Sequence, residues 1–255
     1  MSEPLFRAEG LTKQYGQVKA LQGADFDVAA GEVVALIGDN GAGKSTLVRM
    51  LSGSEQPDGG GIWFDGRPVV LGDPIQARAL GIETVFQDLA LAPHLDPIQN
   101  LYLGREVMRK GLLGKLGFMD TAAMREAGAK SFASLGSTVR NFTGPIGAMS
   151  GGQKQSIAVA RAAAWASKVI FLDEPTAALG VVQTKGVLDL IRRVRDEGIG
   201  VVFISHSMPH VLEVSDRVQV MRHGRRVATY AAKDSSVEQL VGAMTGALDV
   251  QEPAA

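Results

Sequence analysis

Short runs of apolar residues recur along the chain and predict buried strands. The clearest runs are residues 33–37, 169–172 and 201–204. Runs of four or five apolar residues bounded by turn or polar residues are typical of strands covered on both faces of a sheet. Because helix-forming stretches separate these runs, the pattern predicts an α/β fold with one core. Further strands are expected at residues 3–10, 24–30, 62–64, 81–86, 216–221 and 225–230.

Capping residues mark where several helices begin. Asp at the position before a helix can accept a backbone hydrogen bond, and Pro is well accommodated in the first turn. Ser followed three residues later by Glu can form a capping box. Helices are therefore expected at residues 44–53, from Asp73 and Pro74, from Asp96 and Pro97, at 121–135 after Asp120, at 151–166, at 181–197 and after Ser235 to Glu238.

The middle of the chain, residues 92–147, has a different texture. It lacks the alternation of a strand and predicts a helical lobe inserted into the α/β core. A glycine-broken stretch inside it carries the apolar residues Leu112, Leu113, Leu116 and Phe118. We expect these side chains to pack inside the lobe, although a surface for a membrane partner is the alternative.

A glycine-rich turn follows the first apolar run and carries the clearest chemistry. Gly38, Gly43, Lys44 and Ser45 fit the pattern G-x-x-x-x-G-K-[ST]. Glycines allow backbone N–H groups to curl around a phosphate, and the positive end of the next helix faces the same anion. The pattern predicts binding of a nucleoside triphosphate. The expected cradle comprises Gly38, Asp39, Asn40, Gly41, Ala42, Gly43, Lys44, Ser45 and Thr46, with Lys44 on the phosphates and Ser45 on Mg²⁺.

Composition narrows the class of protein. The chain has 255 residues, of which 45% are apolar and 21% charged, which is ordinary for a soluble globular protein. The net charge of −1 gives no indication of nucleic-acid binding, and the lack of cysteine excludes disulfides and thiolate metal sites. No apolar run approaches the roughly 20 residues needed to span a bilayer, and no signal segment is evident. We therefore expect a cytoplasmic protein.

Two carboxylates end the apolar run at 169–172. Asp173 and Glu174 would lie at the carboxyl end of a buried strand, the edge where ligands of open α/β sheets bind. Alone, such a pair is commonly a solvated loop. After a phosphate loop, however, Asp173 is suited to hold Mg²⁺ and Glu174 to orient or deprotonate an attacking water.

A second anion site is expected at the start of the 151–166 helix. Ser150 can cap this helix, and Gln153 can reach back to the cap. Gly151 and Gly152 would leave backbone N–H groups bare at the positive end of the helix. An ordinary capping box is the simpler interpretation of this segment taken alone.

Together these motifs resemble the ATP-binding cassette (ABC) family. Residues 149–153 are similar to its signature motif, and Gln87, Asp173, Glu174 and His206 occur in the family's order and approximate spacing. The resemblance covers about residues 3–245 as a single ABC ATPase domain, and 246–255 would be a disordered tail. It implies an α/β P-loop NTPase core with an N-terminal antiparallel β-subdomain and an inserted α-helical subdomain, approximately 92–147.

The resemblance also implies roles for individual residues. ATP would lie between the phosphate loop of one subunit and residues 150–153 of a second copy, in a head-to-tail dimer. Tyr15 would stack on adenine, Gln87 would contact Mg²⁺ or water, and His206 would hydrogen-bond the γ-phosphate. From sequence alone each has a plainer alternative: a surface tyrosine, a polar strand end and a structural histidine. The expected catalytic residues are Glu174, His206 and Lys44, and the expected Mg²⁺ ligands are Ser45, Gln87 and Asp173.

One segment departs from the family pattern. After the carboxylate pair the family usually has Ser-Ala-Leu-Asp, whereas this chain has Ala-Ala-Leu followed by Gly180. The missing aspartate normally helps to couple the two ATP sites. We expect altered communication between sites, with nucleotide binding and hydrolysis retained.

Two short motifs resemble a particular class of importer. Residues 101–106 and 175–180 are similar to carbohydrate importers of the ribose, xylose and fructose type. Those proteins often fuse two cassettes, so a single cassette would pair with itself. The leading hypothesis is a sugar-importer ATPase at the cytoplasmic face of the inner membrane, bound to permease subunits and served by a periplasmic sugar-binding protein. The alternative is a soluble ABC ATPase acting on a protein scaffold or nucleic acid, although the charge argues against nucleic acid.

Overall fold

The computed structural model describes residues 4–134, 144–177 and 179–247. The chain divides into two compact units, each described here by itself. Unit 1 comprises residues 1–87, 165–175 and 191–255, and unit 2 comprises residues 88–164 and 176–190. The expected tail at 246–255 lies outside the described residues from position 248 onward. Within the described ranges, no helix has the length and apolar character needed to cross a membrane.

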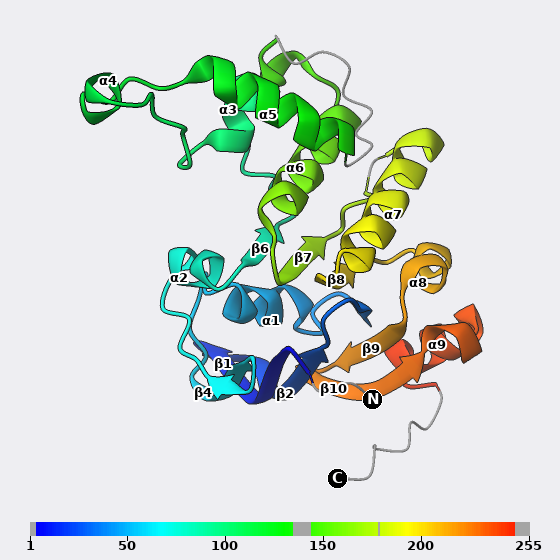
Figure 1. The fold of residues 1–255 in the computed structure, drawn as a ribbon. Coiled ribbons are helices and arrows are strands. Elements are labelled where there is room, and N and C mark those ends of the chain that lie inside the picture. Colours follow the sequence, from blue (N-terminus) through cyan, green and yellow to red (C-terminus); the bar gives the residue numbers. More distant parts are fainter. Residues whose placement is uncertain (1–3, 135–143, 178, 248–255) are drawn as a thin grey trace. The chain divides into compact units, whose positions relative to one another are not determined.

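The larger sheet of unit 1 has the strand order β10-β9-β3-β8-β7-β6 (Figure 1). Neighbours from β9 to β6 run parallel, and β10 pairs antiparallel with β9 at the edge. Every residue of β3, β7 and β8 is buried, as their unbroken apolar runs predict. The strands are β3 Val33–Gly38, β6 Ile82–Val85, β7 Val169–Asp173, β8 Gly200–Ile204, β9 Arg217–Arg222 and β10 Arg225–Ala231.

A second, antiparallel sheet has the order β2-β1-β4-β5. It contains β1 Phe6–Tyr15, β2 Val18–Val28, β4 Gly59–Phe64 and β5 Arg67–Pro68. The expected strands at 3–10 and 24–30 were too short, because β1 and β2 continue to a tight turn after Tyr15. Register shifts between Ala8 and Leu11 accommodate this extension, and such bulges are not visible in an apolar pattern.

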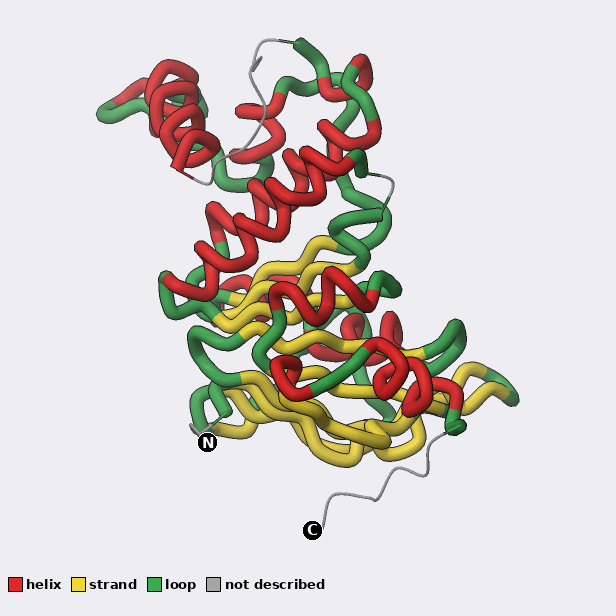
Figure 2. The backbone as a smooth tube through the Cα atoms, turned by 90° about the vertical axis from the view of Figure 1, so that its right-hand side faces the viewer, coloured by secondary structure: helices red, strands yellow, loops and turns green. Residues whose placement is uncertain are grey.

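Aromatic side chains fill the core between the two sheets, which form separate layers of strands (Figure 2). The ring of Phe171 in β7 lies 5.9 Å from that of Phe6 and 6.1 Å from that of Phe26, and Phe6 meets Phe64 edge-on at 5.8 Å. Such tilted and edge-to-face pairs add to the stabilisation from area burial.

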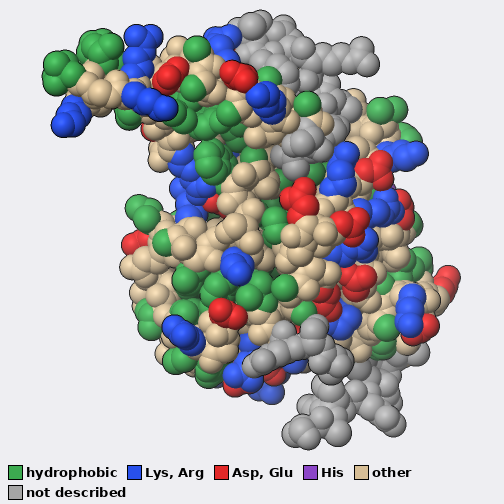
Figure 3. Space-filling view, viewed as in Figure 1, with side chains coloured by type: hydrophobic (Ala, Val, Ile, Leu, Met, Phe, Trp, Pro, Cys, Tyr) green, Lys and Arg blue, Asp and Glu red, His purple; other side chains and the backbone are tan. Residues whose placement is uncertain are grey.

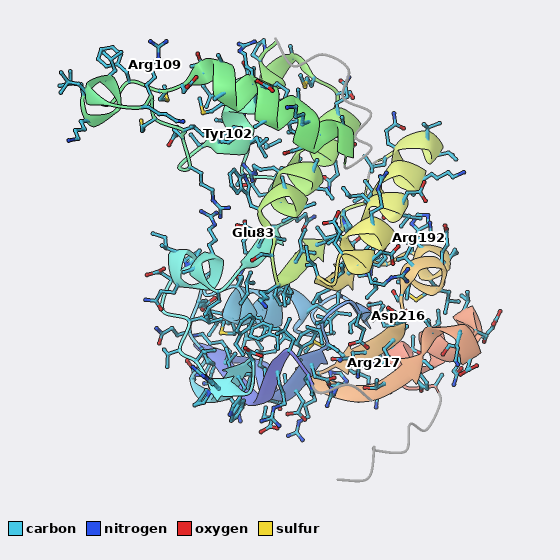
Figure 4. The ribbon with its side chains drawn as sticks, viewed as in Figure 1. Glu83, Tyr102, Arg109, Arg192, Asp216 and Arg217 are labelled. Carbon is cyan, nitrogen blue, oxygen red and sulfur yellow. The ribbon has the colours of Figure 1, made fainter. Side chains whose placement is uncertain are left out.

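Ion pairs also connect strands of the two sheets. Arg217 lies at the start of β9 (Figure 4). It pairs with Asp27 of β2 at 2.7 Å and with Glu32, and Arg226 of β10 also pairs with Asp27. Burial alone would raise the pKa of Asp27, but the hydrogen bonds from the two arginines hold it below its ordinary value. The network therefore fixes β2 against β9 and β10.

The helices of unit 1 begin largely as the capping residues predict. Asp73 caps α2 and accepts a hydrogen bond from Gln76 N at 2.9 Å. The cap of α9 is Ser236 and not Ser235, because Ser236 Oγ accepts from Gln239 N, so that expectation was wrong by one residue. The sequence reasoning also missed α8. These helices are α1 Lys44–Leu51, α2 Pro74–Ala79, α8 Met208–Val214 and α9 Val237–Thr245, with a 3-10 turn at Ala232–Asp234.

Unit 2 is helical, as expected for the middle of the chain. Asp96 and Gln99 form a capping box at the start of α3, and Asp120 Oδ1 accepts from Ala123 N at 3.0 Å at the start of α5. A Cβ at Gly128 would lie 2.8 Å from Ile98, so α3 and α5 pack closely. The elements are α3 Pro97–Tyr102, α4 Leu112–Lys115, α5 Thr121–Ser134, a 3-10 turn at Ile146–Ala148, α6 Gly151–Trp165 and α7 Val181–Asp196, which continues into unit 1.

The expectation that the apolar residues around α4 pack inside the lobe was wrong. Leu112, Leu113, Leu116 and Phe118 are 73%, 46%, 65% and 55% exposed. The interior of unit 2 is filled by other side chains, and α4 contributes no buried residue. The buried apolar residues include Ile98, Leu101, Tyr102, Met124, Phe132, Ile146, the inner face of α6, and Val187, Leu188 and Leu190 of α7.

Candidate functional site

The phosphate loop connects β3 to α1 in unit 1, as the sequence predicts. Gly43 stands at the N-cap of α1 with φ of 99°, and a Cβ there would lie 2.7 Å from the Ala20 carbonyl oxygen. Gly41 also has a positive φ of 80°, and nothing lies within 4 Å of its Cβ position. Glycine at 43 therefore permits close packing below the loop, and glycine at 41 leaves its outer side open to an anion.

Lys44 is held under this loop by backbone carbonyls. Its Nζ atom donates to Gly38 O at 2.7 Å and to Asp39 O at 3.1 Å, and the residue is only 8% exposed. Burial lowers the pKa of Lys44, while Glu174 and Asp173 oppose that shift. The ammonium group is thus a cation fixed at the phosphate loop, close enough to the carboxylate pair to interact with its charge.

The remaining cradle residues differ in their exposure to solvent. Ser45 is exposed in the first turn of α1, and Thr46 is half-buried beside it. Asp39 and Asn40 are exposed, with Asp39 Oδ1 accepting from Asn40 N at 2.8 Å. Ala42 is buried, and its amide donates to Asp39 O at 3.1 Å.

The turn between β9 and β10 supports the phosphate loop from behind. Gly224 N donates to Ala42 O at 3.0 Å, and its Cα lies 3.3 Å from the Cβ position of Gly43. A Cβ at Gly224 would itself approach Ala20 O at 2.7 Å. Sequence reasoning missed this supporting turn. The His223-Gly224 pair between two short strands indicated a hairpin, but not what the hairpin contacts.

Asp173 and Glu174 lie where the sequence places them, at the carboxyl end of β7. Asp173 is buried and pairs in register with Ile204, the last residue of β8. Glu174 has φ of +51°, which is unusual for a residue with a side chain, and its amide donates to Ile204 O at 3.0 Å. Such strained conformations gather at functional sites, and here the strain turns the side chain at the strand end.

The two carboxyl groups titrate abnormally. Burial, together with the nearby charge of Asp173, raises the pKa of Glu174 to about 7. Burial also raises the pKa of Asp173, against the opposing charges of Lys44 and His206. A carboxyl group with a pKa near neutral can accept a proton effectively at neutral pH, which is the requirement for a general base.

His206 follows β8 and faces Glu174. Its Nε2 atom lies 3.3 Å from Glu174 Oε1, and its side chain is about half exposed. Burial and the charge of Lys44 lower the pKa of His206. With a neutral imidazole this 3.3 Å approach is not an ion pair. The structure therefore brings together Lys44, Asp173, Glu174 and His206, each close enough to shift the pKa of others.

Two other expected ligand residues, Tyr15 and Gln87, also belong to unit 1. Tyr15 ends β1 and is 40% exposed; its hydroxyl donates to Glu55 Oε2 at 2.6 Å, and Lys13 Nζ lies 5.8 Å from its ring centroid. Gln87 is exposed two residues after β6. The described contacts give neither residue a link to the carboxylate pair.

The second expected anion site belongs to unit 2. Ser150 N donates to Gln153 Oε1 at 2.9 Å, and Gln153 N donates to Ser150 Oγ at 3.3 Å. These reciprocal bonds confirm the predicted capping box. Gly151 is exposed with nothing within 4 Å of its Cβ position, and Gly152 is half-buried beside Leu179. The first amides of a 15-residue helix thus face the surface.

The oxygen donors of the cluster fit Mg²⁺ in kind. Mg²⁺ prefers one or two carboxylates or hydroxyls together with phosphate oxygens and water. Ser45 and Asp173 offer a hydroxyl and a carboxylate, both hard ligands. Among the described residues there is no group of three or more His, Cys, Asp or Glu suited to hold a metal, so an all-protein cage is not the arrangement found there.

Comparisons with known proteins agree with this site. The family model described as ABC transporter matches residues 21–177. The chain is 48% identical to the fructose import ATP-binding protein FrcA of Rhizobium meliloti, covering 96% of this chain and 95% of that protein. It is 42% identical to the xylose/arabinose import ATP-binding protein XylG of Sulfolobus acidocaldarius, covering 94% of each.

A solved structure shares the fold. The ADP conformation of MJ1267, an ATP-binding cassette of an ABC transporter, matches with a TM-score of 0.78 at 25% identity, covering 96% of each chain. The α/β P-loop core, the antiparallel β-subdomain and the helical subdomain that the sequence predicts are thereby confirmed. The chain belongs to the ABC transporter family, and it is an ATP-binding ATPase of that family.

Proposed function

We propose that this chain is the ATP-hydrolysing subunit of an ABC importer for a sugar. The observation that carries the proposal is the cluster of Lys44, Glu174 and His206 behind a phosphate loop at one edge of the sheet. The names of the two relatives supply the substrate class, because they are proteins of fructose and of xylose/arabinose import. A soluble, non-transport ATPase has no such support.

The phosphate loop would bind the triphosphate of ATP through its backbone amides and Lys44. Ser45, Gln87 and Asp173 would hold Mg²⁺, with the donor chemistry of Ser45 and Asp173 in favour. When bound, Mg²⁺ neutralises developing charge on the phosphate oxygens. Tyr15 is exposed at the end of β1, where its hydroxyl donates to Glu55, and its ring would stack on adenine.

Glu174 would act as the general base toward the attacking water. Its pKa of about 7 leaves a substantial fraction ionised at neutral pH while keeping it basic enough to take a proton. His206, neutral and 3.3 Å from Glu174 Oε1, would orient that carboxylate and hydrogen-bond the γ-phosphate. The proton removed from water would reside on Glu174 until solvent takes it.

Two copies of the chain would complete the site. We propose a head-to-tail dimer in which residues 150–153 of one copy meet the γ-phosphate held by the phosphate loop of the other. The amides of Gly151 and Gly152 at the start of α6 support this assignment, since an anion is a natural ligand of a helix N-terminus. The helical segment 92–147 would then act as a subdomain of the single cassette at 3–245, with Gln87 relaying nucleotide state to it.

The partners would be permease subunits that the ATPase contacts from the cytoplasmic face of the inner membrane. A periplasmic sugar-binding protein would deliver the substrate to them. Selectivity for one sugar would lie in those partners, because the site on this chain would recognise only the nucleotide. Closure of the ATP-loaded dimer would drive the permease between its access states, and hydrolysis would reopen it.

Reconstitution tests the importer directly. The chain, co-purified with its membrane-spanning partner and placed in proteoliposomes, should support ATP-dependent uptake of labelled fructose, xylose or ribose when the binding protein is added. Recovery only with soluble proteins, or hydrolysis stimulated by nucleic acid, would contradict the proposal. In parallel, the Glu174→Gln variant loaded with ATP should have the mass of a dimer in light scattering. If it stays monomeric both alone and with the permease, the proposal of an ATP site shared by two copies is wrong.

A further inference from the structure

Residues 107–119 form a hairpin between α3 and α5 of unit 2, with α4 at its tip (Figure 1). We refer to these residues as the arm. Arg109 N donates to Phe118 O at 2.9 Å across the hairpin, and Val107 N donates to the sulfur of Met124 in α5 at 3.4 Å. The arm is therefore a closed hairpin attached at its base.

The tip of the arm has a defined shape. A Cβ at Gly114 would lie 1.8 Å from the carbonyl oxygen of Arg109, so the two sides of the hairpin touch at this glycine. Leu116 N donates to Leu112 O at 3.1 Å, and Phe118 N donates to Leu113 O at 3.0 Å. These bonds define the backbone from which the apolar side chains of the tip project.

Apolar side chains cover this tip and face solvent. Each is between 39% and 73% exposed, and none of the residues of α4 is buried. They project from a single turn of helix and its two flanks, so they form a wedge and not a groove. The exposed set comprises Val107, Met108, Leu112, Leu113, Leu116, Phe118 and Met119.

Positive charge accompanies the apolar tip. Arg109, Lys110 and Lys115 are exposed, and residues 107–119 contain no Asp or Glu. Figure 3 shows basic and hydrophobic side chains together at this end of unit 2, and Figure 4 places Arg109 on the hairpin beside α4. The whole chain carries a net charge of −1, so the arm is a local concentration of positive charge in an otherwise balanced protein.

We propose that the arm inserts its apolar tip into the headgroup region of an anionic lipid bilayer. Segments of this kind, with Leu and Phe beside Lys and Arg, bind at the boundary between headgroups and acyl chains. Each basic side chain near an anionic surface adds to that binding. A protein partner fits less well, because lysine is depleted at protein interfaces and a convex tip offers no broad complementary face.

Vesicle binding tests this proposal with the full chain and without permease or nucleotide. The protein should co-sediment with vesicles of equal parts phosphatidylcholine and phosphatidylglycerol, and bind pure phosphatidylcholine vesicles much more weakly. Raising the salt should weaken binding, because attraction between exposed charges is screened. Replacing Arg109 and Lys110 together by Gln should weaken binding about 25-fold, since each basic side chain accounts for about fivefold.

A second variant addresses the apolar contribution. Leu112→Ser with Leu116→Ser should reduce binding to anionic vesicles at least tenfold, because each buried apolar side chain contributes to partitioning. The matched control is Val70→Ser with Ile75→Ser, which removes two equally exposed apolar side chains (79% and 73%) from unit 1. All variants change exposed residues, and a thermal melt verifies that each is folded.

Three results would overturn the assignment. One is the absence of binding to the anionic vesicles. Another is binding that the arm variants leave unchanged, or that the Val70 and Ile75 control reduces equally. The third is that the arm binds no vesicles but is covered by co-purified permease in detergent. That result would make the arm a protein-binding surface. None of these results bears on ATP hydrolysis or sugar uptake, so the proposed function is judged separately.

Discussion

The Nε2 atom of His206 lies 3.3 Å from Oε1 of Glu174, and the two groups shift in opposite directions from their ordinary pKa values. Burial raises the pKa of the carboxyl to about 7, and burial also lowers that of the imidazole. Both shifts favour uncharged forms. With a pKa of about 7, Glu174 can exchange a proton with its surroundings around neutral pH, which suits a base that must be recycled in each turnover.

Turnover should depend on pH through Glu174. Because the base must be unprotonated to accept a proton, kcat for ATP should rise between about pH 6 and 8 and level off above the pKa near 7. Glu174→Gln should lose about 10²–10⁴-fold in kcat and show no rise with pH. Nucleotide binding should be unchanged in the same variant. A rate within a few-fold of the wild type would remove Glu174 from its proposed role.

The raised pKa of Glu174 should also make the free energy of unfolding depend on pH. Glu174 binds its proton more tightly folded (pKa about 7) than unfolded (ordinary value 4.5), so ionising it destabilises the folded state. This penalty is absent below about pH 4.5, grows as pH rises, and is complete above about pH 7. Replacing Glu174 by Gln should therefore raise the free energy of unfolding at pH 8 by on the order of 1–3 kcal/mol, with little change at pH 5.

Urea unfolding at the two pH values measures this difference. Asp39→Asn is the control, because Asp39 is an exposed loop carboxylate in the same cradle. The control measures how far removing one exposed carboxylate from this cradle changes stability by itself. An equal gain for Glu174→Gln at pH 5 and pH 8 would mean that packing, and not ionisation, accounts for the stabilisation.

Lys44→Ala should weaken ATP binding itself. The ammonium group is fixed by Gly38 O and Asp39 O at the mouth of the loop, where the triphosphate would carry its negative charge. Loss of a charge-assisted contact of about 1.5–3 kcal/mol predicts a dissociation constant about 10- to 150-fold higher. Isothermal titration with ATP measures it, and Lys19→Ala, at an exposed lysine of β2, serves as the control. Unchanged affinity in Lys44→Ala would contradict the prediction.

Local chemistry explains which parts of the fold the sequence predicted well. The phosphate loop and the caps at Asp73, Asp96 and Ser150 involve atoms within a few residues of one another, so their residue types suffice to identify them. The buried strands followed from short apolar runs for the same reason. The roles of Tyr15 and Gln87 stay predictions, because the described contacts do not join them to the carboxylates.

Long-range contacts explain what was missed. Gly224 meets Ala42 across 182 positions, and nothing in the His223-Gly224 turn indicates that partner. The extension of β1 and β2 depends on bulges that pair polar residues. Leu112 and its neighbours were assigned to the lobe interior because an apolar pattern shows which side chains avoid water, but not what covers them.

Gly224→Ala should disturb the phosphate loop. Its φ is +74°, and a Cβ would lie 2.7 Å from Ala20 O and 3.0 Å from Leu21 Cα. The backbone must shift, and the bond from Gly224 N to Ala42 O shifts with it. We expect ATP affinity to fall at least fivefold and the free energy of unfolding to fall by about 1–3 kcal/mol.

A matched glycine separates backbone strain from contact. Gly66 has φ of +71° with nothing within 4 Å of its Cβ position, so Gly66→Ala adds strain alone. Its stability should fall by about 1 kcal/mol, and its ATP affinity should remain that of the wild type. Equal losses of ATP affinity in the two variants would show that the turn at Gly224 does not support the loop.

Gly180→Asp should restore a helix cap that this chain lacks. Thr184 N donates to Gly180 O at 2.9 Å at the start of α7, so residue 180 occupies the capping position. A Cβ there would meet only the flexible end of Gln183, at 2.8 Å from its Oε1. An aspartate can accept a backbone hydrogen bond from the first turn, so Gly180→Asp should stabilise α7 by about a few tenths of a kcal/mol.

The same variant tests communication between the two proposed ATP sites. If the family's aspartate couples them, Gly180→Asp should raise the Hill coefficient for ATP hydrolysis above that of the wild type. Gly180→Asn is the control, because Asn caps a helix equally well but carries no charge. If both variants gain stability but only Gly180→Asp gains cooperativity, the charge of the aspartate accounts for the coupling between sites. No change in cooperativity with either variant would mean that this chain coordinates its sites by contacts elsewhere, and that glycine at position 180 is neutral for coupling.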